Sequence, residues 1–355
     1  MTRIWSVLAL ALVMTGSASA VVTTKATAEQ QVTVTRNLEA IKPGDQATQD
    51  KAEDDLAALG TDYLPVLRHV LAEQQTALTK AEASDETLGD AYTIRSHTQA
   101  LDSAIIRLTW KINPRVIMND YLATLKDFNG QPFTMSGQTY RVTAPSVAQV
   151  FPKVLFYVMR FRMYPVARIL PEPLKANNLF ILSADGKLTQ VADVESLQKH
   201  FLAVTPANKT LIPAIVTAWL CLSQELAQDG MFRFIAPTKV VQTPHADGAI
   251  SASAEVAVDT RGGNQGKISV TMTFTAKGKV TDIQEARTLK AGMRPICQAT
   301  KLLDPDPIVR RMAEQDLLLM GRAAESYLVE RRALATPALQ AAIDKIWAQI
   351  VADGR

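Results

Sequence analysis

A sixteen-residue pattern occurs twice in this chain, once near each end of the printed sequence, and constrains the fold more than any other feature. The two copies lie at a constant offset of 261 positions. The identical residues in the first copy are Asp45, Ala52, Glu53, Asp55, Leu56 and Gly60, and they match Asp306, Ala313, Glu314, Asp316, Leu317 and Gly321. Self-similarity at a fixed offset is the sequence signature of a repeated structural unit.

The residues at the ends of the second copy predict a capped helix. Asp306 suits the N-cap, and Pro307 suits the first helical position, where no N–H is needed. Gly321 suits the left-handed residue that ends a helix. Apolar residues between them fall on one helical face: Val309, Met312, Ala313, Leu317 and Met320. Leu318 and Leu319 widen that face, which predicts a helix packed on two sides.

Two more helices are predicted after each copy. The second covers 62–72 in the first copy and 323–334 in the second. The third is predicted from five identities at an offset of 238: Thr98, Ala100, Leu101, Ala104 and Ile105 match Thr336, Ala338, Leu339, Ala342 and Ile343. The first copy therefore holds 23 extra residues, around 73–96.

A capped helix ending in Leu and Gly, then a short helix, then another, resembles the HEAT-like helical repeats of uncharacterised exported bacterial proteins. The resemblance covers roughly a third of the chain. It implies N-terminal and C-terminal three-helix segments, 21–112 and 291–355, on either side of a different middle. Helical repeats of this kind offer extended surfaces for protein binding.

The middle of the chain, 113–290, predicts an α+β domain. A long helix is expected over Thr210–Asp229, with Gly230 ending it, and four strands are expected at 231–235, 250–258, 268–274 and 280–289. Strict alternation of apolar and polar residues predicts an antiparallel four-stranded meander with one buried face, packed on the helix. This layout resembles the cystatin-like or NTF2-like (nuclear transport factor 2-like) class over about 80 residues.

Other strands are predicted before this helix. Hairpins are expected between 132–135 and 139–143 and between 179–182 and 187–191, and 154–163 is expected to be a well-buried strand. Arg160, Arg162 and Arg168 alternate with aromatic residues there, and we expect the arginines to face solvent.

The first twenty residues predict a cleaved signal peptide. Arg3 is followed by the apolar stretch 4–14 and by the small residues Ala18-Ser19-Ala20, so the cut is expected after Ala20. The apolar stretch is shorter than the ~20 residues that a membrane span needs. The mature chain is therefore expected to be periplasmic or secreted, without a membrane span.

The composition excludes several classes of site. The net charge of +3 gives no reason to expect nucleic acid as a partner. Four His and two Cys are too few for a zinc cluster or a dense disulfide framework, and no metal or cofactor is predicted. The two thiols, Cys221 and Cys297, form either a disulfide, which an oxidising compartment allows, or two separate buried cysteines.

No catalytic motif such as HExxH or GxSxG is present. The first hypothesis is therefore a non-catalytic exported protein that binds or scaffolds an unidentified protein partner. The second is a binder of a small molecule or polymer on the concave sheet face, with Trp219, Phe232 and Phe234 near the ligand. The third is an enzyme of unfamiliar type that uses His245 and Asp247.

Overall fold

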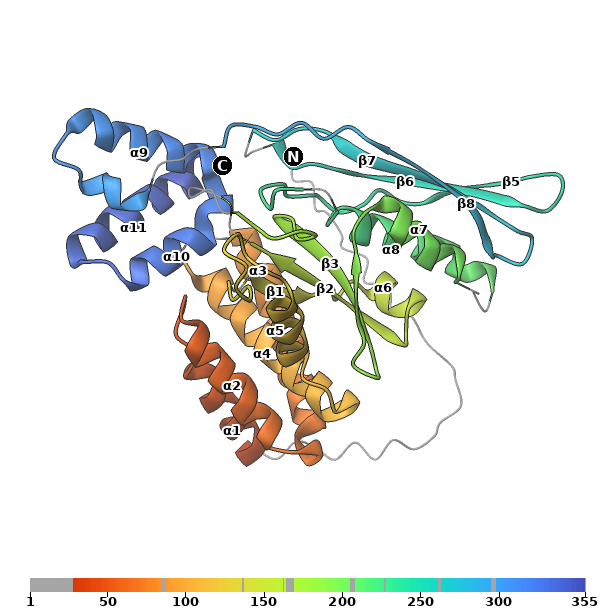
Figure 1. Ribbon diagram of the computed structural model, residues 1–355, viewed down its shortest axis with the longest axis horizontal. Helices are drawn as coiled ribbons and strands as arrows, with labels where there is room; N and C mark the ends of the chain where they lie inside the picture. Colours follow the sequence, from red (N-terminus) through yellow and green to blue (C-terminus); the bar gives the residue numbers. More distant parts are fainter. Residues whose placement is uncertain are drawn as a thin grey trace, which may run out of the picture.

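The computed structural model describes residues 28–84, 87–135, 137–161, 163, 169–204, 208–226, 228–260, 263–294 and 298–354. The predicted α+β fold is confirmed: helices at the N-terminal side are followed by two four-stranded antiparallel sheets and by C-terminal helices (Figure 1). The predicted signal peptide lies outside the described residues. Within the described ranges, no helix is both long enough and apolar enough to cross a bilayer.

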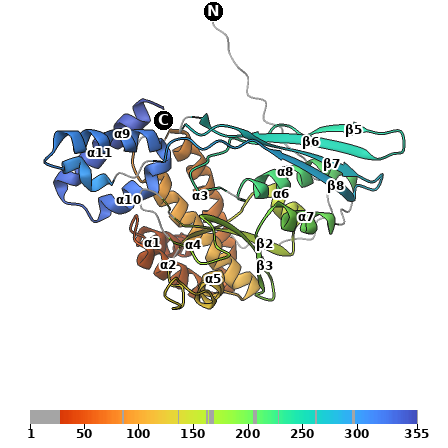
Figure 2. The same ribbon diagram turned by 45° about the horizontal axis from the view of Figure 1, so that its top comes forward.

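The helical regions lie side by side at one end of the molecule. The N-terminal helices are α1 (Ala28–Glu39), α2 (Gln46–Ala58), α3 (Leu64–Ser84), α4 (Asp90–Trp110) and α5 (Pro114–Thr124). The C-terminal helices are α9 (Pro307–Met320), α10 (Glu325–Ala333) and α11 (Pro337–Ala352), preceded by the 3₁₀ turn η4 (Ala299–Leu303). Helix α10 packs against α4, so the two ends of the described chain are in contact (Figures 1 and 2).

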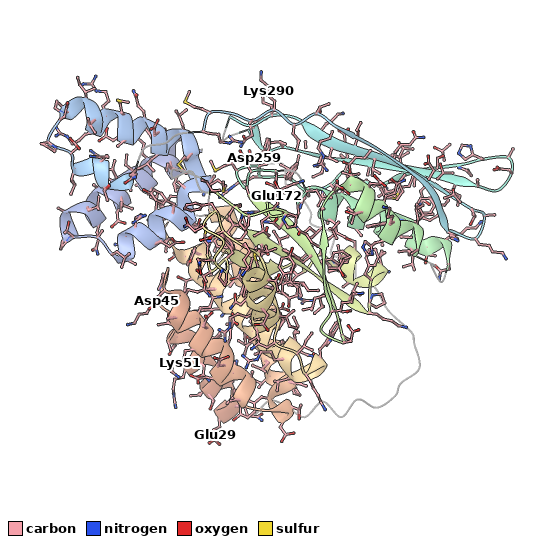
Figure 3. The ribbon with its side chains drawn as sticks, viewed as in Figure 1. Glu29, Asp45, Lys51, Glu172, Asp259 and Lys290 are labelled. Carbon is pink, nitrogen blue, oxygen red and sulfur yellow. The ribbon has the colours of Figure 1, made fainter. Side chains whose placement is uncertain are left out.

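Both predicted helix caps are confirmed. The Asp45 carboxylate, at the start of α2 (Figure 3), accepts a hydrogen bond from the Ala47 N–H at 3.0 Å. The Asp306 carboxylate accepts one from the Ile308 N–H at 2.8 Å. Gly60 and Gly321, which follow the two helices, have φ angles of +86° and +56°. Only glycine adopts such angles without strain, so the two helices stop where the sequence predicts.

The two copies share their order of elements. Helix α2 is followed by the 3₁₀ turn η1 (Thr61–Tyr63), α3 and α4, as α9 is followed by η5 (Gly321–Ala324), α10 and α11. Matched positions in the first two helices are buried alike: Ala52, Leu56 and Leu67 correspond to Ala313, Leu317 and Leu328. The extra residues of the first copy extend α3 to 21 residues, against 9 in α10. The match weakens in the third helix, because Ala100 is buried and Ala338 is exposed.

The first sheet was not predicted as a sheet. Its strands, in spatial order, are β1 (Gln138–Arg141), β2 (Val154–Arg160), β3 (Asn177–Ser183) and β4 (Leu188–Val191). The predicted hairpin from 179–182 to 187–191 is confirmed as β3–β4. The predicted hairpin from 132–135 to 139–143 is wrong, because β1 pairs with β2. Pro132 forms only an isolated bridge with Lys126, and its missing N–H prevents a longer ladder.

Both faces of the first sheet are buried. On one face Phe156 and Val158 belong to the same apolar core as α8, described below. On the other face Tyr157 and Met159 share a core with residues of α4 and α5, namely Ile106, Met118 and Leu122. A strand buried on both faces has no polar side, which explains the continuous apolar run in β2.

The second sheet is the predicted meander, with strands β5 (Val241–Pro244), β6 (Ile250–Ala257), β7 (Lys267–Phe274) and β8 (Val280–Arg287). The predicted first strand, 231–235, is wrong. This segment runs beside the end of β6 but forms only an isolated bridge between Phe234 and Val258. Pro237, which has no N–H to donate, follows closely, and regular pairing resumes at β5.

Three helices lie between the sheets: α6 (Pro145–Val150), α7 (Val194–Leu202) and α8 (Ile212–Ser223) (Figures 1 and 2). The 3₁₀ turn η2 (Lys209–Leu211) leads into α8, which ends earlier than Asp229, the predicted end. Arg287 of β8 explains the early end, because its guanidinium donates hydrogen bonds to the carbonyls of Leu226 at 2.6 Å and Ser223 at 3.0 Å. A tertiary contact thus replaces the next helical turn.

A chain of aromatic side chains joins the two sheets through this helical layer. Phe151 packs edge-on against Phe156 of β2, with ring centroids 5.1 Å apart, and against Phe201 of α7 at 5.0 Å. Phe201 in turn lies 5.1 Å from Trp219 of α8. The Trp219 indole N–H donates a hydrogen bond to Glu285 of β8 at 2.8 Å. Edge-to-face geometry stabilises each ring pair beyond simple burial.

A compact charge cluster joins α2 to α4 and α5. The Arg115 guanidinium lies 2.9 Å from an oxygen of Asp50 and 2.8 Å from one of Asp54, which also pairs with Arg107 at 2.6 Å. Glu53 lies deeper, where it accepts a hydrogen bond from the Ser103 hydroxyl. Burial raises the pKa of Glu53 from 4.5 to about 7, against the lowering effect of Arg115.

We expect Asp45→Ala and Asp306→Ala each to reduce the free energy of unfolding by ~0.5–2 kcal/mol, because each removes an N-cap acceptor. Urea midpoints at fixed pH measure the effect. Asp120→Ala, which removes an exposed aspartate inside α5, is the control and should change stability by less than about 0.5 kcal/mol. A neutral result at both caps would contradict the repeated-helix interpretation.

Glu53→Gln is expected to change the pH dependence of stability. The pKa of Glu53 is higher in the folded protein than in the unfolded chain, so the folded state binds the extra proton. The stability of the wild type relative to Glu53→Gln should therefore fall as pH rises from about 4.5 through about 7, by up to roughly 3 kcal/mol. Urea unfolding across this range measures it. Asp55→Asn, at a half-exposed carboxylate that pairs with Lys51 at 2.7 Å, is the matched surface control.

Candidate functional site

The residues predicted to bind a ligand do not share an open surface. Trp219 is fully buried between α8 and β8, where Glu285 accepts hydrogen bonds from its indole N–H and from the Ser223 hydroxyl. Phe232 and Phe234 are half-buried on the segment before β5, with their rings stacked 6.3 Å apart. The inner face of the second sheet is therefore filled by α8 side chains.

His245 and Asp247 lie at the exposed turn between β5 and β6. The His245 ring nitrogen Nε2 is 2.6 Å from the Ser251 hydroxyl. The Asp247 carboxylate accepts a hydrogen bond from the Ala249 N–H at 3.0 Å. Each side chain thus stabilises its own hairpin, and the carboxylate is engaged with backbone rather than with the imidazole.

Cys221 is a half-buried residue of α8. Burial raises the pKa of its thiol, and a hydrogen bond with Ser146 opposes that shift. A thiol with a raised pKa is a weak nucleophile, so this residue has the character of a structural cysteine. Cys297 lies outside the described residues, and its pairing with Cys221 stays a prediction.

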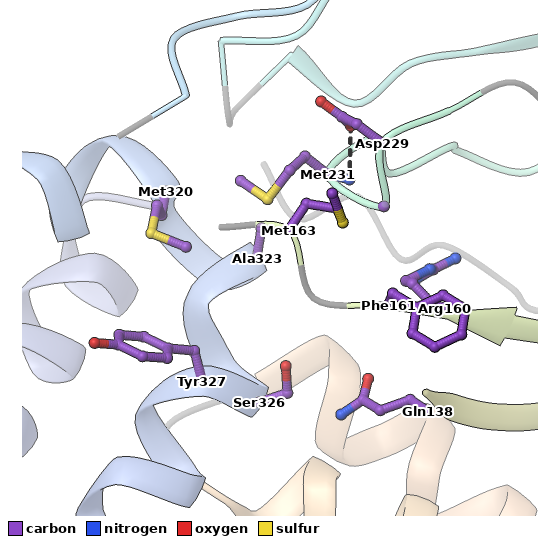
Figure 4. A pocket seen from close by; sticks show the side chains of 11 residues that line it. Gln138, Arg160, Phe161, Met163, Asp229, Met231, Met320, Ala323, Ser326 and Tyr327 are labelled. Carbon is purple, nitrogen blue, oxygen red and sulfur yellow. Dashed lines mark hydrogen bonds between the residues drawn. The ribbon is translucent and has the colours of Figure 1, made fainter. Parts of the chain in front are cut away.

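A small pocket lies where the first sheet, the loop before β5 and the C-terminal helices meet (Figure 4). We call it the junction pocket, and its cavity is about 60 Å³. It is lined by Gln138, Arg160, Phe161, Met163, Asp229, Gly230, Met231, Met320, Ala323, Ser326 and Tyr327. A pocket for a drug-sized ligand has roughly 300–1,000 Å³, so this one admits only an ion or a few atoms.

A buried polar network forms one wall of the junction pocket. The Arg160 guanidinium donates hydrogen bonds to Asn177 at 2.8 Å, to the Tyr140 hydroxyl at 2.6 Å and to Glu225 at 3.1 Å. Asn177 also donates to the Glu225 carboxylate at 2.8 Å. Burial, followed by the charge of Glu225, raises the pKa of Tyr140. The network therefore compensates the charge of Arg160 within the protein.

The prediction that the strand arginines face solvent is wrong for Arg160, whose side chain is only 29% exposed. The alternation of arginine with aromatic residues suggested a solvated face, but both faces of β2 are covered. Asn177 and Glu225, which complete the network, are 48 positions apart, and no local sequence signal joins them. Arg162 and Arg168 lie outside the described residues.

The outer side of α9 carries an apolar surface that the rest of the described chain leaves exposed. Ile308, Met312 and Leu319 are 64%, 57% and 39% exposed. Their spacing of four and seven positions places them on one helical face, which we call the α9 stripe. The opposite side of the helix packs into the C-terminal core through Ala313 and Leu317. The prediction that Met312 shares the packed face with Ala313 and Leu317 is therefore wrong, and the second side of α9, which was predicted to be packed, is exposed.

We expect Glu225→Ala to reduce the free energy of unfolding by roughly 2–4 kcal/mol, because it leaves Arg160 and Asn177 without their shared acceptor. Chemical unfolding at neutral pH measures the loss. The control is Glu255→Ala, which removes an exposed carboxylate paired with Lys267 at 2.7 Å and should cost less than about 1 kcal/mol. Equal effects of the two substitutions would contradict a buried network.

No protein-family model, curated protein or solved structure matches this chain. Its function is therefore inferred from the position, burial and charge of its own side chains, and two features stand out: the α9 stripe and the junction pocket.

Proposed function

We propose that this chain is an exported, non-catalytic protein-binding or scaffolding protein and that the α9 stripe is its docking surface. The observation that carries the proposal is the exposure of Ile308, Met312 and Leu319 on one face of a well-capped helix. Contiguous exposed apolar residues on a folded domain mark an interaction site. A rigid helix that already packs on its other side presents them without a further ordering cost.

The alternative functions have less support. A binder that uses the concave sheet face would need an open cavity, whereas Trp219 and the other α8 side chains fill that face. An enzyme that uses His245 and Asp247 would need them to converge on a substrate, whereas both stabilise an exposed hairpin turn. Because side chains fill the inner face of the second sheet, we expect the functional surface to lie on the outside of the molecule.

The first copy of the repeat indicates what kind of group contacts the flank of the helix beside the stripe. In α2, Asp50 and Asp54 occupy the positions that correspond to Arg311 and Gln315 of α9. The guanidinium of Arg115, at the start of α5, lies within 3 Å of both carboxylates, at 2.9 Å and 2.8 Å. A charged residue from a neighbouring helix therefore covers this part of α2.

The charge is reversed in α9, where Arg311 stands in place of Asp50. A partner helix would therefore bring a carboxylate to Arg311 and apolar residues to the stripe. This is recognition between two amphipathic helices, with apolar anchors along one face of each. The partner we propose is an amphipathic helix of another protein with acidic residues along one flank of its apolar face. The resemblance to HEAT-like repeats, whose helices stack on neighbours, supports the same geometry.

Site-specific photo-crosslinking in the native host tests this proposal. A benzoylphenylalanine residue replaces Met312 in one variant and Leu334 in the control, since Leu334 is 85% exposed but lies off the stripe. We expect a discrete adduct from position 312 alone, with the cross-linked peptide in an acidic amphipathic helix of another protein. Adding Arg311→Glu should reduce its yield at least fivefold.

Three outcomes would contradict the proposal. The first is no adduct at position 312, and the second is equal adducts at positions 312 and 334. The third is an adduct between two copies of this chain, which would make the α9 stripe a self-association surface. Circular dichroism of each variant checks that the fold is retained.

A further inference from the structure

Three methionines from distant parts of the chain line the junction pocket. Met163 follows β2, Met231 lies in the loop that leads to β5, and Met320 is the last residue of α9. Figure 4 shows their thioether side chains around the cavity, with Ala323 and Tyr327 on the helical side. The lining of this cavity of about 60 Å³ thus includes three thioether side chains.

The chemistry of these side chains selects one class of ligand. A thioether is neutral, soft and polarisable, and it accepts hydrogen bonds only weakly. Soft sulfur ligands favour Cu(I) over Zn²⁺, Mg²⁺ and Ca²⁺, which need imidazole, thiolate or oxygen donors. Among the described residues, His, Cys, Asp and Glu form no group of three or more that could hold a metal ion.

The charged residues of the pocket do not oppose a cation. The Arg160 guanidinium is compensated by Glu225 through a hydrogen bond of 3.1 Å. The Asp229 carboxylate pairs with Arg294, and it also accepts a hydrogen bond from the Met231 N–H at 3.0 Å. Asp229 therefore acts as a positioning residue, because it fixes the backbone of Met231, which carries one of the thioethers.

We propose that the junction pocket binds a single soft monovalent cation, Cu(I), through the thioethers of Met163, Met231 and Met320. Methionine has three rotatable bonds, so the sulfur atoms can turn toward a common centre without moving the backbone. A bound ion would connect β2, the loop before β5 and α9. Occupancy is then expected to stabilise the attachment of the C-terminal helices to the first sheet. This site is independent of the partner proposed for the α9 stripe.

Silver(I) is the probe for the experiment, because it has the same ligand preference as Cu(I) and no redox chemistry under the assay conditions. The protein is the full mature chain with Cys221→Ser and Cys297→Ser, which removes both thiols as competing ligands. Native mass spectrometry and calorimetric titration in chloride-free buffer measure the stoichiometry and the affinity. We expect one Ag(I) per chain and no comparable binding of Zn²⁺.

Volume-conserving substitutions assign the ligands. Met163→Leu, Met231→Leu and Met320→Leu should each weaken Ag(I) binding at least tenfold, since leucine fills similar space without a sulfur atom. The matched controls are Met118→Leu and Met272→Leu, at buried methionines that do not line the junction pocket. They should leave the Ag(I) affinity unchanged. In spectra of the protein with ¹³C-methyl methionine, only the resonances of Met163, Met231 and Met320 should shift when Ag(I) is added.

Any of three results would overturn the proposal. These are no Ag(I) binding by the cysteine-free protein, undiminished binding by all three pocket variants, and equal weakening by the control variants. If a pocket variant fails to fold, the methyl spectrum of the parent protein decides, because a shift at Met312 or Met118 in place of the pocket resonances would place the ion elsewhere.

Discussion

Helix α8 is apolar over more than half of its circumference, and the arrangement of the molecule depends on covering it. Its fully buried residues include Ile212, Ile215, Val216, Trp219, Leu220 and Leu222, whereas the side that carries Pro213, Thr217 and Cys221 is half-buried. A helix with so wide an apolar surface must be covered from several directions. Burying each large side chain contributes ~1.5–3 kcal/mol, and two sheets with α6 and α7 supply the enclosing surface. One face of the first sheet packs against α8, and α4 and α5 cover the opposite face of that sheet.

The sequence predicts the features that have local signals. The helix caps at Asp45 and Asp306 follow from side-chain chemistry within three residues. The second sheet follows from alternation, because only one of its faces is buried. The first sheet lacks that signal: β2 and β3 are buried on both faces, and β1 has four residues. Trp219, which the second hypothesis places near a ligand, is fully buried, because Val216 and Leu220 outside the predicted stripe of α8 are apolar and buried too.

The two candidate sites differ in how far local sequence reveals them. Leu318 and Leu319 indicate a wide apolar surface on α9, but Leu318 packs into the C-terminal core, and that signal does not place Ile308 and Met312 on the exposed side. The junction pocket has no local signal, because Met163, Met231 and Met320 come together only when the C-terminal helices reach the first sheet. The same holds for the network of Arg160, Asn177 and Glu225. Contacts between distant segments, rather than motifs, form the wall of that pocket.

The position of α8 in the chain has a consequence for the order of folding during synthesis. The first sheet precedes α8 in the chain, whereas the second sheet, which covers the other side of α8, follows it. Arg287 of β8 lies 64 positions beyond its hydrogen-bond partner Ser223. As the chain emerges from its N-terminus, α8 can dock on the first sheet with one apolar flank still open to water. That flank closes only after β8 has been made. Until then the nascent chain exposes the kind of surface that chaperones bind and that leads to aggregation.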